Sequence, residues 1–183
     1  MVDHTTRIAV IGGGMGGLTA AIALTKVAGV QVTVFEQARK LGDVGAGVTV
    51  APNAQLVLDK LGILEQVRNA GAVPDAHGVY QDSMGNLVTE AAWEDSAKQY
   101  QNIGMYRPDL VNVLAAEVDA DTIRLGHRLT GIEQTEAGVR VEFENGVQEV
   151  FDAVVGADGI HSVVRDTLMK PPAPVYSGFI AYR

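Results

Sequence analysis

The sequence predicts an α/β fold with a central parallel sheet and an inserted antiparallel β-meander. The first observation is a strand, helix and strand pattern over residues 7–36, the unit from which parallel sheets are built. The second is an apolar run at 151–155 followed by a helix signal. The third is a series of alternating segments between residues 122 and 150, which is typical of antiparallel strands.

The N-terminal segment has the periodicity of a βαβ unit. Residues 7–11 form a β-branched run that ends in glycines, and residues 31–36 alternate as a strand does. Between them, apolar side chains recur at helical spacing over 14–27: Leu18, Ala21, Ile22 and Leu24. Crossovers between parallel strands are right-handed, so we expect a right-handed βαβ unit of about 30 residues.

The middle of the chain predicts helices and an antiparallel excursion. A helix is expected after Pro52, with a buried face made of Ala54, Val57, Leu58 and Leu61. Gly62 interrupts it, and residues 63–70 are expected to add another turn or two. Two extended runs within 77–93 flank a turn-like Met84-Gly85-Asn86. Arg107-Pro108 opens the next helix, whose expected buried residues are Leu110, Val113 and Leu114.

The second half predicts three or four strands between residues 122 and 150. Asn145-Gly146 indicates a hairpin with a type I′ turn, which needs positive φ at both residues. Residues 151–155 are then expected to form a buried parallel strand, and Ser162 to cap a helix that ends near Met169. A stiff proline-rich linker over 171–174 precedes a strand-like segment at 175–183.

Composition excludes several classes of function. The 183 residues are 47% hydrophobic, which suits one domain and part of a second. A net charge of -8 and a pI near 4.9 disfavour nucleic acid and anionic membrane as partners. The absence of cysteine excludes disulfides and thiolate chemistry and makes the cytoplasm the expected location. The four histidines are scattered, so no metal site is expected.

The glycines between the first strand and helix have the dinucleotide-binding spacing Gly12-x-Gly14-x-x-Gly17. Gly12 is expected to make the tight turn, Gly14 to let backbone N–H groups approach a pyrophosphate, and Gly17 to allow close packing of helix on strand. Glu36 ends the second strand, where its carboxylate can accept hydrogen bonds from a ribose. An acidic residue there repels a 2′-phosphate, so the motif favours FAD or NAD over NADP.

Three further motifs separate FAD from NAD by resemblance. They are the run Val34-Phe35-Glu36-Gln37-Ala38, then Gly45-Ala46-Gly47-Val48 with Pro52-Asn53-Ala54, and finally Asp158-Gly159-Ile160-His161-Ser162-Val163-Val164-Arg165. In this order they resemble the single-component FAD-dependent aromatic hydroxylases, the group that includes salicylate hydroxylase and 6-hydroxynicotinate 3-monooxygenase. Tyr176-Ser177-Gly178 and Arg183 are similar too, so the resemblance covers nearly the whole chain.

The resemblance implies a Rossmann-like FAD-binding fold, NADH or NADPH as co-substrate, and a small aromatic acid as substrate. It places residues 14–17 at the pyrophosphate, Glu36 and Gln37 at the ribose, and residues 47–49 beside the flavin. It also implies that Arg107 reaches the phosphates, that the backbone at Leu129 faces the adenine, and that Asp158 contacts the cofactor and influences nicotinamide binding. The full implied set is Gly12, Gly14, Met15, Gly16, Gly17, Glu36, Gln37, Gly47, Val48, Thr49, Arg107, Leu129 and Asp158. No catalytic residue is assigned.

Two departures from the family limit this interpretation. Thr49 stands where the hydroxynicotinate enzymes have an active-site histidine, so their substrate does not transfer directly. The family's third signature, a Gly-Asp pair that closes over the flavin, is absent. We therefore expect residues 1–172 to be an incomplete FAD-binding domain and 173–183 the start of a truncated substrate-binding sheet, not competent in hydroxylation alone. Uncovered apolar surface then favours self-association.

Two alternatives remain open at this point. A non-catalytic FAD- or nucleotide-binding module would share every motif. An NAD-dependent dehydrogenase domain fits the glycine motif but leaves residues 158–165 unexplained. Ordinary roles are also available to single residues: Arg107 as a surface arginine, Asp158 as a turn residue, and Trp93 and Tyr100 as packing residues.

Overall fold

The computed structural model describes residues 5–42, 46–73, 77–92, 101–170, 172 and 175–180. They form two compact units, one from Met1–Asp43 with Leu114–Arg183 and the other from Val44–Val113. The predictions that concern Gly45, Trp93, Tyr100 and Arg183 lie outside the described residues. No helix within these ranges is long and apolar enough to cross a membrane.

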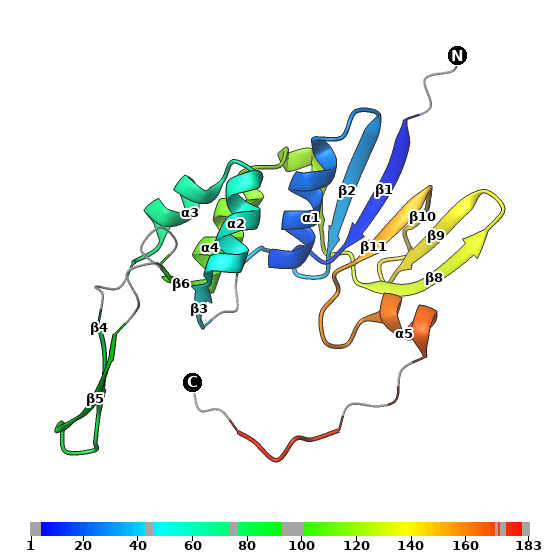
Figure 1. The fold of residues 1–183 in the computed structure, drawn as a ribbon. Helices are drawn as coiled ribbons and strands as arrows, with labels where there is room; N and C mark the ends of the chain where they lie inside the picture. Colours follow the sequence, from blue (N-terminus) through cyan, green and yellow to red (C-terminus); the bar gives the residue numbers. More distant parts are fainter. Residues whose placement is uncertain are drawn as a thin grey trace. The chain divides into compact units, whose positions relative to one another are not determined.

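The first unit contains a four-stranded sheet in which every described pairing is parallel. Its strands are β1 (Thr6–Ile11), β2 (Val30–Glu36), β7 (Ile123–Leu125) and β11 (Ala153–Gly156), in the order β11-β1-β2-β7. Helix α1 (Met15–Thr25) connects β1 to β2 and packs on both. The predicted βαβ unit is confirmed, and β11 joins β1 on the side away from β2 (Figure 1).

An antiparallel meander packs against the face of this sheet opposite α1 (Figure 1). It consists of β8 (Leu129–Thr135), β9 (Gly138–Phe143) and β10 (Gln148–Phe151), in the order β10-β9-β8, and a short 3₁₀ turn at Ala120–Thr122 precedes β7. Side chains from the sheet, the meander and the helix that begins at Val163 share a buried cluster: Ala9, Ile11, Phe35, Leu129, Val141, Phe143, Phe151 and Val164. Neighbouring side chains on a strand point to opposite faces, so Val10 instead meets α1. The predicted parallel sheet with an inserted meander is confirmed.

Helix α5 (Val163–Met169) follows β11 in the first unit and ends where the sequence predicted. Ser162 is its N-cap, and the Ser162 hydroxyl accepts a hydrogen bond from the Arg165 amide at 2.9 Å. A Cβ atom on Gly156 would lie 2.8 Å from Val164, so the helix packs directly on the end of β11. The chain thus turns sharply from strand to helix through residues 157–162.

In its described residues, the second unit carries two small antiparallel ribbons and three helices. One ribbon pairs β3 (Gly47–Val50) with β6 (Ile103–Tyr106), and the other pairs β4 (His77–Gln81) with β5 (Leu87–Ala92). The helices are α2 (Pro52–Lys60), α3 (Leu64–Ala70) and α4 (Arg107–Ala115), whose last two residues belong to the first unit. The interruption at Gly62, which has φ +75°, and the helix start at Arg107 are both as predicted.

The turn between β4 and β5 is organised by Asp82. Its carboxylate accepts hydrogen bonds from the Asn86 side chain and from the amides of Asn86 and Met84. Because these donors favour the charged form, with the Asn86 side chain contributing most, they hold the pKa of Asp82 below its ordinary value. The turn expected around Met84-Gly85-Asn86 is therefore stabilised by a residue just outside the predicted tripeptide.

In the second half of the chain, the hairpin at Asn145-Gly146 and the parallel strand after Phe151 are confirmed, but three details are wrong. Gly146, with φ +85°, is the only residue of the Asn145-Gly146 pair with positive φ. The Asn145 side chain accepts from the Val147 amide, which makes a longer turn than type I′. The buried strand expected at 151–155 is split at Asp152, and β11 is largely accessible. Residues 175–180 form no strand, and Phe179 is 86% exposed.

The buried faces of α2 and α4 also differ from the predicted ones. In α2, Ala54 and Val57 are exposed, whereas Gln55 and Leu58 are buried. The helix is turned by about one residue relative to the apolar pattern, because a buried Gln55 finds backbone partners. In α4, Leu110 and Leu114 are buried as expected, but Val111 is buried more fully than Val113.

Candidate cofactor-binding site

The loop between β1 and α1 is held in a conformation that requires glycine at its first position. Gly12 has φ +108°, and its amide donates to the carbonyl of Phe35 at 2.8 Å. A Cβ atom at Gly12 would lie 2.3 Å from the carbonyl oxygen of Ala157. Both the backbone conformation and the nearby carbonyl exclude a side chain here.

Gly17 brings the first turn of α1 against that loop. A Cβ atom at Gly17 would lie 1.8 Å from the carbonyl oxygen of Gly12 and 3.3 Å from the side chain of Val10. Gly16, one residue earlier, is exposed, and a Cβ atom there would meet nothing within 4 Å. The protein itself therefore demands glycine at position 17 but not at position 16.

The N-terminus of α1 has the features of an anion-binding site. Its N-cap is Gly14, no side chain forms a capping hydrogen bond, and its first turn contains no acidic residue. The first amides of a helix lack acceptors within the helix, and the helix dipole adds partial positive charge. Met15 and Gly16 lie in this first turn, and Gly16 opens onto free space. A pyrophosphate matches this arrangement in charge.

Glu36 links the glycine loop to the segment after β2. One carboxylate oxygen accepts from the Gly13 amide and the other from the Ala38 amide, each at 2.7 Å. A Cβ atom at Gly13 would lie 2.9 Å from the Glu36 Cβ, so the approach also needs glycine at position 13. Each carboxylate oxygen can accept a second hydrogen bond, which leaves capacity for two hydroxyl groups of a ligand. The neighbouring Gln37 is exposed.

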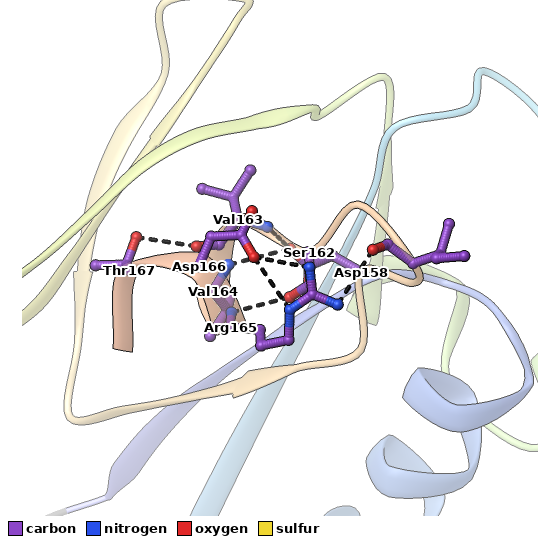
Figure 2. A network of polar contacts seen from close by, with 8 residues as sticks. Asp158, Ser162, Val163, Val164, Arg165, Asp166 and Thr167 are labelled. Carbon is purple, nitrogen blue, oxygen red and sulfur yellow. Dashed lines mark hydrogen bonds and ion pairs between the residues drawn. The ribbon is translucent and has the colours of Figure 1, made fainter. Parts of the chain in front are cut away.

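The turn after β11 is organised by the carboxylate of Asp158 (Figure 2). One oxygen accepts from the Ser162 hydroxyl at 2.5 Å, and the other from the amides of Val163 at 2.7 Å and Val164 at 3.2 Å. The Arg165 guanidinium donates to the Ile160 carbonyl at 3.2 Å and pairs with Asp166. The Asp158 side chain is thus directed at the start of α5, where it holds the turn in place.

The two turns lie side by side at the carboxyl ends of the parallel strands. The Ala157 amide donates to the Ile11 carbonyl at 2.8 Å, and a Cβ atom at Gly12 would lie 3.2 Å from the amide nitrogen of Asp158. The chain leaves β1 through α1 towards β2 on one side, whereas β11 lies on the other side of β1, so the strand order changes direction there. In open α/β sheets, ligands bind outside the carboxyl ends of the strands at such a switch point.

The other predicted residues fall in two places. Leu129 begins β8 in the first unit, and its side chain is in the core, so only its backbone is available to a ligand. In the second unit, Gly47, Val48 and Thr49 lie on β3, opposite β6, and Thr49 is exposed. The Arg107 amide donates to the Ala46 carbonyl at 3.0 Å, which places Arg107 at the end of the same ribbon.

Sequence reasoning missed two residues that the structure makes important. Gly13 was counted only as a spacer in the motif, although its amide bonds to Glu36. The signal was present in the sequence as a third consecutive glycine. Gln55 is not among the residues that the apolar spacing places on the buried face of its helix, yet it is fully buried. No apolar periodicity identifies a buried amide.

A parallel α/β sheet with a glycine loop, an uncapped helix N-terminus and a glutamate at the end of the second strand defines a dinucleotide-binding domain. The family model described as FAD binding domain matches residues 5–176, and the chain belongs to this family. FAD is therefore its cofactor, and the anion site at α1 and the acceptor capacity of Glu36 fit that group. The alternative of an NAD-dependent dehydrogenase domain is set aside.

Known relatives are monooxygenases. The chain is 35% identical to 3-amino-4-hydroxybenzoate 2-monooxygenase of Streptomyces cremeus over 186 residues, covering 100% of this chain and 47% of that protein. It is 32% identical to 6-hydroxynicotinate 3-monooxygenase of Pseudomonas fluorescens, covering 100% and 48%. The crystal structure of Klebsiella pneumoniae HpxO complexed with FAD and uric acid superposes with a TM-score of 0.78 at 27% identity, covering 88% and 41%. The chain spans about half the length of these proteins, and the resemblance to aromatic hydroxylases is confirmed.

Proposed function

We propose that this chain is the FAD-binding part of an NADH- or NADPH-dependent monooxygenase that hydroxylates a small aromatic acid. The observation that carries the proposal is the contact between the glycine loop at Gly12 and the turn at Asp158. Two motifs far apart in sequence thereby share one edge of the sheet, as a single extended ligand requires. Residues 1–172 form the FAD-binding domain in this proposal, and 173–183 lead into a substrate-binding sheet.

The first unit binds the ADP half of FAD in this proposal. The amides of Met15, Gly16 and Gly17 at the start of α1 hold the pyrophosphate, with Gly12 and Gly14 shaping the loop. Glu36 uses its remaining acceptor capacity for ribose hydroxyls, and Gln37 lies beside it. The backbone at Leu129 faces the adenine. Asp158 acts by fixing the turn that lies against Gly12, because its carboxylate is engaged at α5.

The second unit supplies the residues proposed for the flavin. An unpaired strand edge presents alternating N–H donors and C=O acceptors. The pyrimidine edge of the flavin also alternates acceptor, donor and acceptor, so the backbone of Gly47, Val48 and Thr49 is a suitable partner. Arg107 carries a permanent charge and contacts the phosphates. Bound FAD supplies the redox chemistry, and the chain's residues bind it, orient it and exclude water around it.

The substrate class is inferred from the relatives' names. They act on an aminohydroxybenzoate and a hydroxynicotinate, both aromatic rings that carry a carboxylate. Thr49 has no imidazole, so it performs no acid–base step of the kind a histidine supplies. A non-catalytic FAD-binding module differs from the proposed enzyme part in one respect: it gains no activity when the remaining substrate-binding portion is present.

The first experiment is the visible absorption spectrum of the purified chain, followed by identification of the small molecule it releases on denaturation. The proposal predicts the bands of oxidised flavin and release of FAD. Release of FMN or NAD, or a protein that remains colourless in excess FAD, contradicts it. Hydroxylated aromatic acid formed per NADH consumed, measured with the protein that carries this chain, separates the enzyme from the non-catalytic module.

Replacing Glu36 is expected to weaken FAD binding strongly. Glu36→Ala removes an acceptor for the Gly13 and Ala38 amides as well as for the ribose. Hydrogen bonds to charged groups contribute about 1.5–3 kcal/mol each, so we expect FAD affinity to fall about 100-fold by fluorescence titration. Glu65→Ala on α3, an exposed carboxylate paired with Arg68, is the matched control and leaves affinity unchanged. Equal affinity in Glu36→Ala and the wild type contradicts the assigned ribose site.

We also propose that the chain self-associates through exposed apolar side chains. Val175, Phe179 and Ile180 are 91%, 86% and 72% exposed, far more than apolar residues in a covered segment. Light scattering is expected to give a mass that rises above 19.3 kDa with concentration. The variant Phe179→Ser/Ile180→Ser is expected to stay monomeric over the same range. A wild-type mass that does not change with concentration refutes self-association.

A further inference from the structure

Gln55 is the largest buried polar side chain in the described part of the second unit. It lies on α2 with 0% exposure, at a position where a helix ordinarily carries an apolar residue. Its side-chain Nε2 donates to the carbonyl of Val50 at 2.9 Å and to the carbonyl of Gln101 at 2.6 Å. Its Oε1 is buried and has no hydrogen-bond partner among the described residues. Burying an amide at such cost indicates a specific role for it.

The chemistry of the two partners fixes the orientation of the amide. Backbone carbonyls accept hydrogen bonds and never donate them, so the side-chain nitrogen, not the oxygen, must face both. Both hydrogens of the NH₂ group are then used, one for each carbonyl. A carboxylate or a thioether of similar size provides no such donor.

The two carbonyls belong to the two strands of one ribbon. Val50 is the last residue of β3 and pairs with Ile103 of β6, while Gln101 lies just before β6. At the other end of the ribbon, where Gly47 pairs with Tyr106, the Arg107 amide continues the pairing by donating to the Ala46 carbonyl. Gln55 is therefore the side chain that ties β3 to the chain entering β6.

We infer that Gln55 is a positioning residue that holds the β3 backbone in the position from which it contacts the flavin. The inference rests on the proposed function, because it takes Gly47, Val48 and Thr49 as the flavin-side residues. β3 has only four residues and one partner strand, so its own ladder restrains it weakly. A buried amide that holds its last carbonyl restrains the strand where the ladder ends. Gln55 touches no ligand itself and acts through the backbone it holds.

The test compares FAD with ADP, which carries the adenosine and pyrophosphate but no flavin. The variants are Gln55→Met, which keeps the length and apolar volume without a donor, and Gln55→Glu, which places acceptors against two carbonyls. Loss of the positioning hydrogen bonds is expected to weaken FAD binding about tenfold and to change the visible spectrum of the bound flavin. ADP affinity is expected to stay within about twofold of wild type, since the first unit binds most of ADP in this proposal. Arg107, the phosphate contact proposed from the second unit, lies at the end of the ribbon away from Val50 and Gln101.

Leu56→Glu, on the exposed side of the same helix, is the matched control and is expected to change neither affinity. The inference is overturned if both Gln55 variants bind FAD with wild-type affinity and spectrum. It is also overturned if FAD and ADP affinities fall together, because Gln55 would then support only the stability of the chain. Should Gln55→Glu fail to fold, Gln55→Met decides between these results. If the wild-type chain binds ADP but not FAD, that result contradicts the proposed function itself, whatever the variants do.

Discussion

Gly17→Ala is expected to destabilise the chain by about 3 kcal/mol and to abolish measurable FAD binding. The added methyl group would lie 1.8 Å from the Gly12 carbonyl oxygen, which is backbone and cannot rotate away. Relief requires α1 to move off the loop, and that movement displaces the helix N-terminus proposed to hold the pyrophosphate. Thermal and urea unfolding measure the first effect, and flavin fluorescence titration measures the second.

Gly16→Ala is the matched control for this prediction. It makes the same change in the preceding residue of the same helix, where a Cβ atom meets nothing within 4 Å. Alanine favours helix over glycine by up to about 1 kcal/mol, so the free energy of unfolding should stay constant or rise. If Gly17→Ala unfolds at the same urea concentration as Gly16→Ala, the close packing of α1 on the loop is refuted.

Asp158→Ala is expected to lower the free energy of unfolding by about 2 kcal/mol and to weaken FAD binding. The substitution leaves the amides of Val163 and Val164 and the hydroxyl of Ser162 without their carboxylate acceptor. The turn that rests against Gly12 then loses its anchor to α5. Urea unfolding gives the stability change, and exchange of the α5 amides should accelerate in the same variant.

Two comparisons isolate this role of Asp158. Asp166→Ala removes an exposed carboxylate from the same helix, where it pairs with Arg165, and should cost less than about 1 kcal/mol. Ser162→Ala removes one cap and should cost about 1 kcal/mol, less than Asp158→Ala. Stability of Asp158→Ala equal to that of Asp166→Ala would show that the three hydrogen bonds do not hold the turn.

Periodicity was sufficient for the framework of the fold. Strands β1 and β2 and helix α1 lie within two residues of their predicted bounds, because Leu18, Ala21 and Ile22 pack on one face as the pattern required. The pattern failed for α2, where the hydrogen bonds of Gln55 decided which face is buried. It failed again at Asp152, which breaks the 151–155 run by bonding to the Arg7 amide at 2.7 Å. Both failures come from polar side-chain contacts, to Gln101 and to Arg7 among others, which hydrophobic spacing does not encode.

The outline of the candidate site could be predicted because its main motifs are local in sequence. The glycine spacing and Glu36 are local signals, and the structure places them together at the end of β1 and β2. The second turn was expected beside them because the family resemblance places both turns at one cofactor, and its contact at Gly12 and Ala157 agrees. Local sequence carried no information on what Asp158 bonds to, because its partners at α5 depend on how the turn folds. The binding roles of individual residues stay predictions.

The most direct measurement is an FAD titration of the isotopically labelled chain followed by amide chemical shifts. If one cofactor occupies the shared edge of the sheet, the amides of residues 12–17 and those of 157–162 shift together, with a single dissociation constant. Amides at the far end of the central sheet, such as that of Val30, should remain unchanged. Shifts confined to one of the two turns, or absent from both, would contradict a common FAD site.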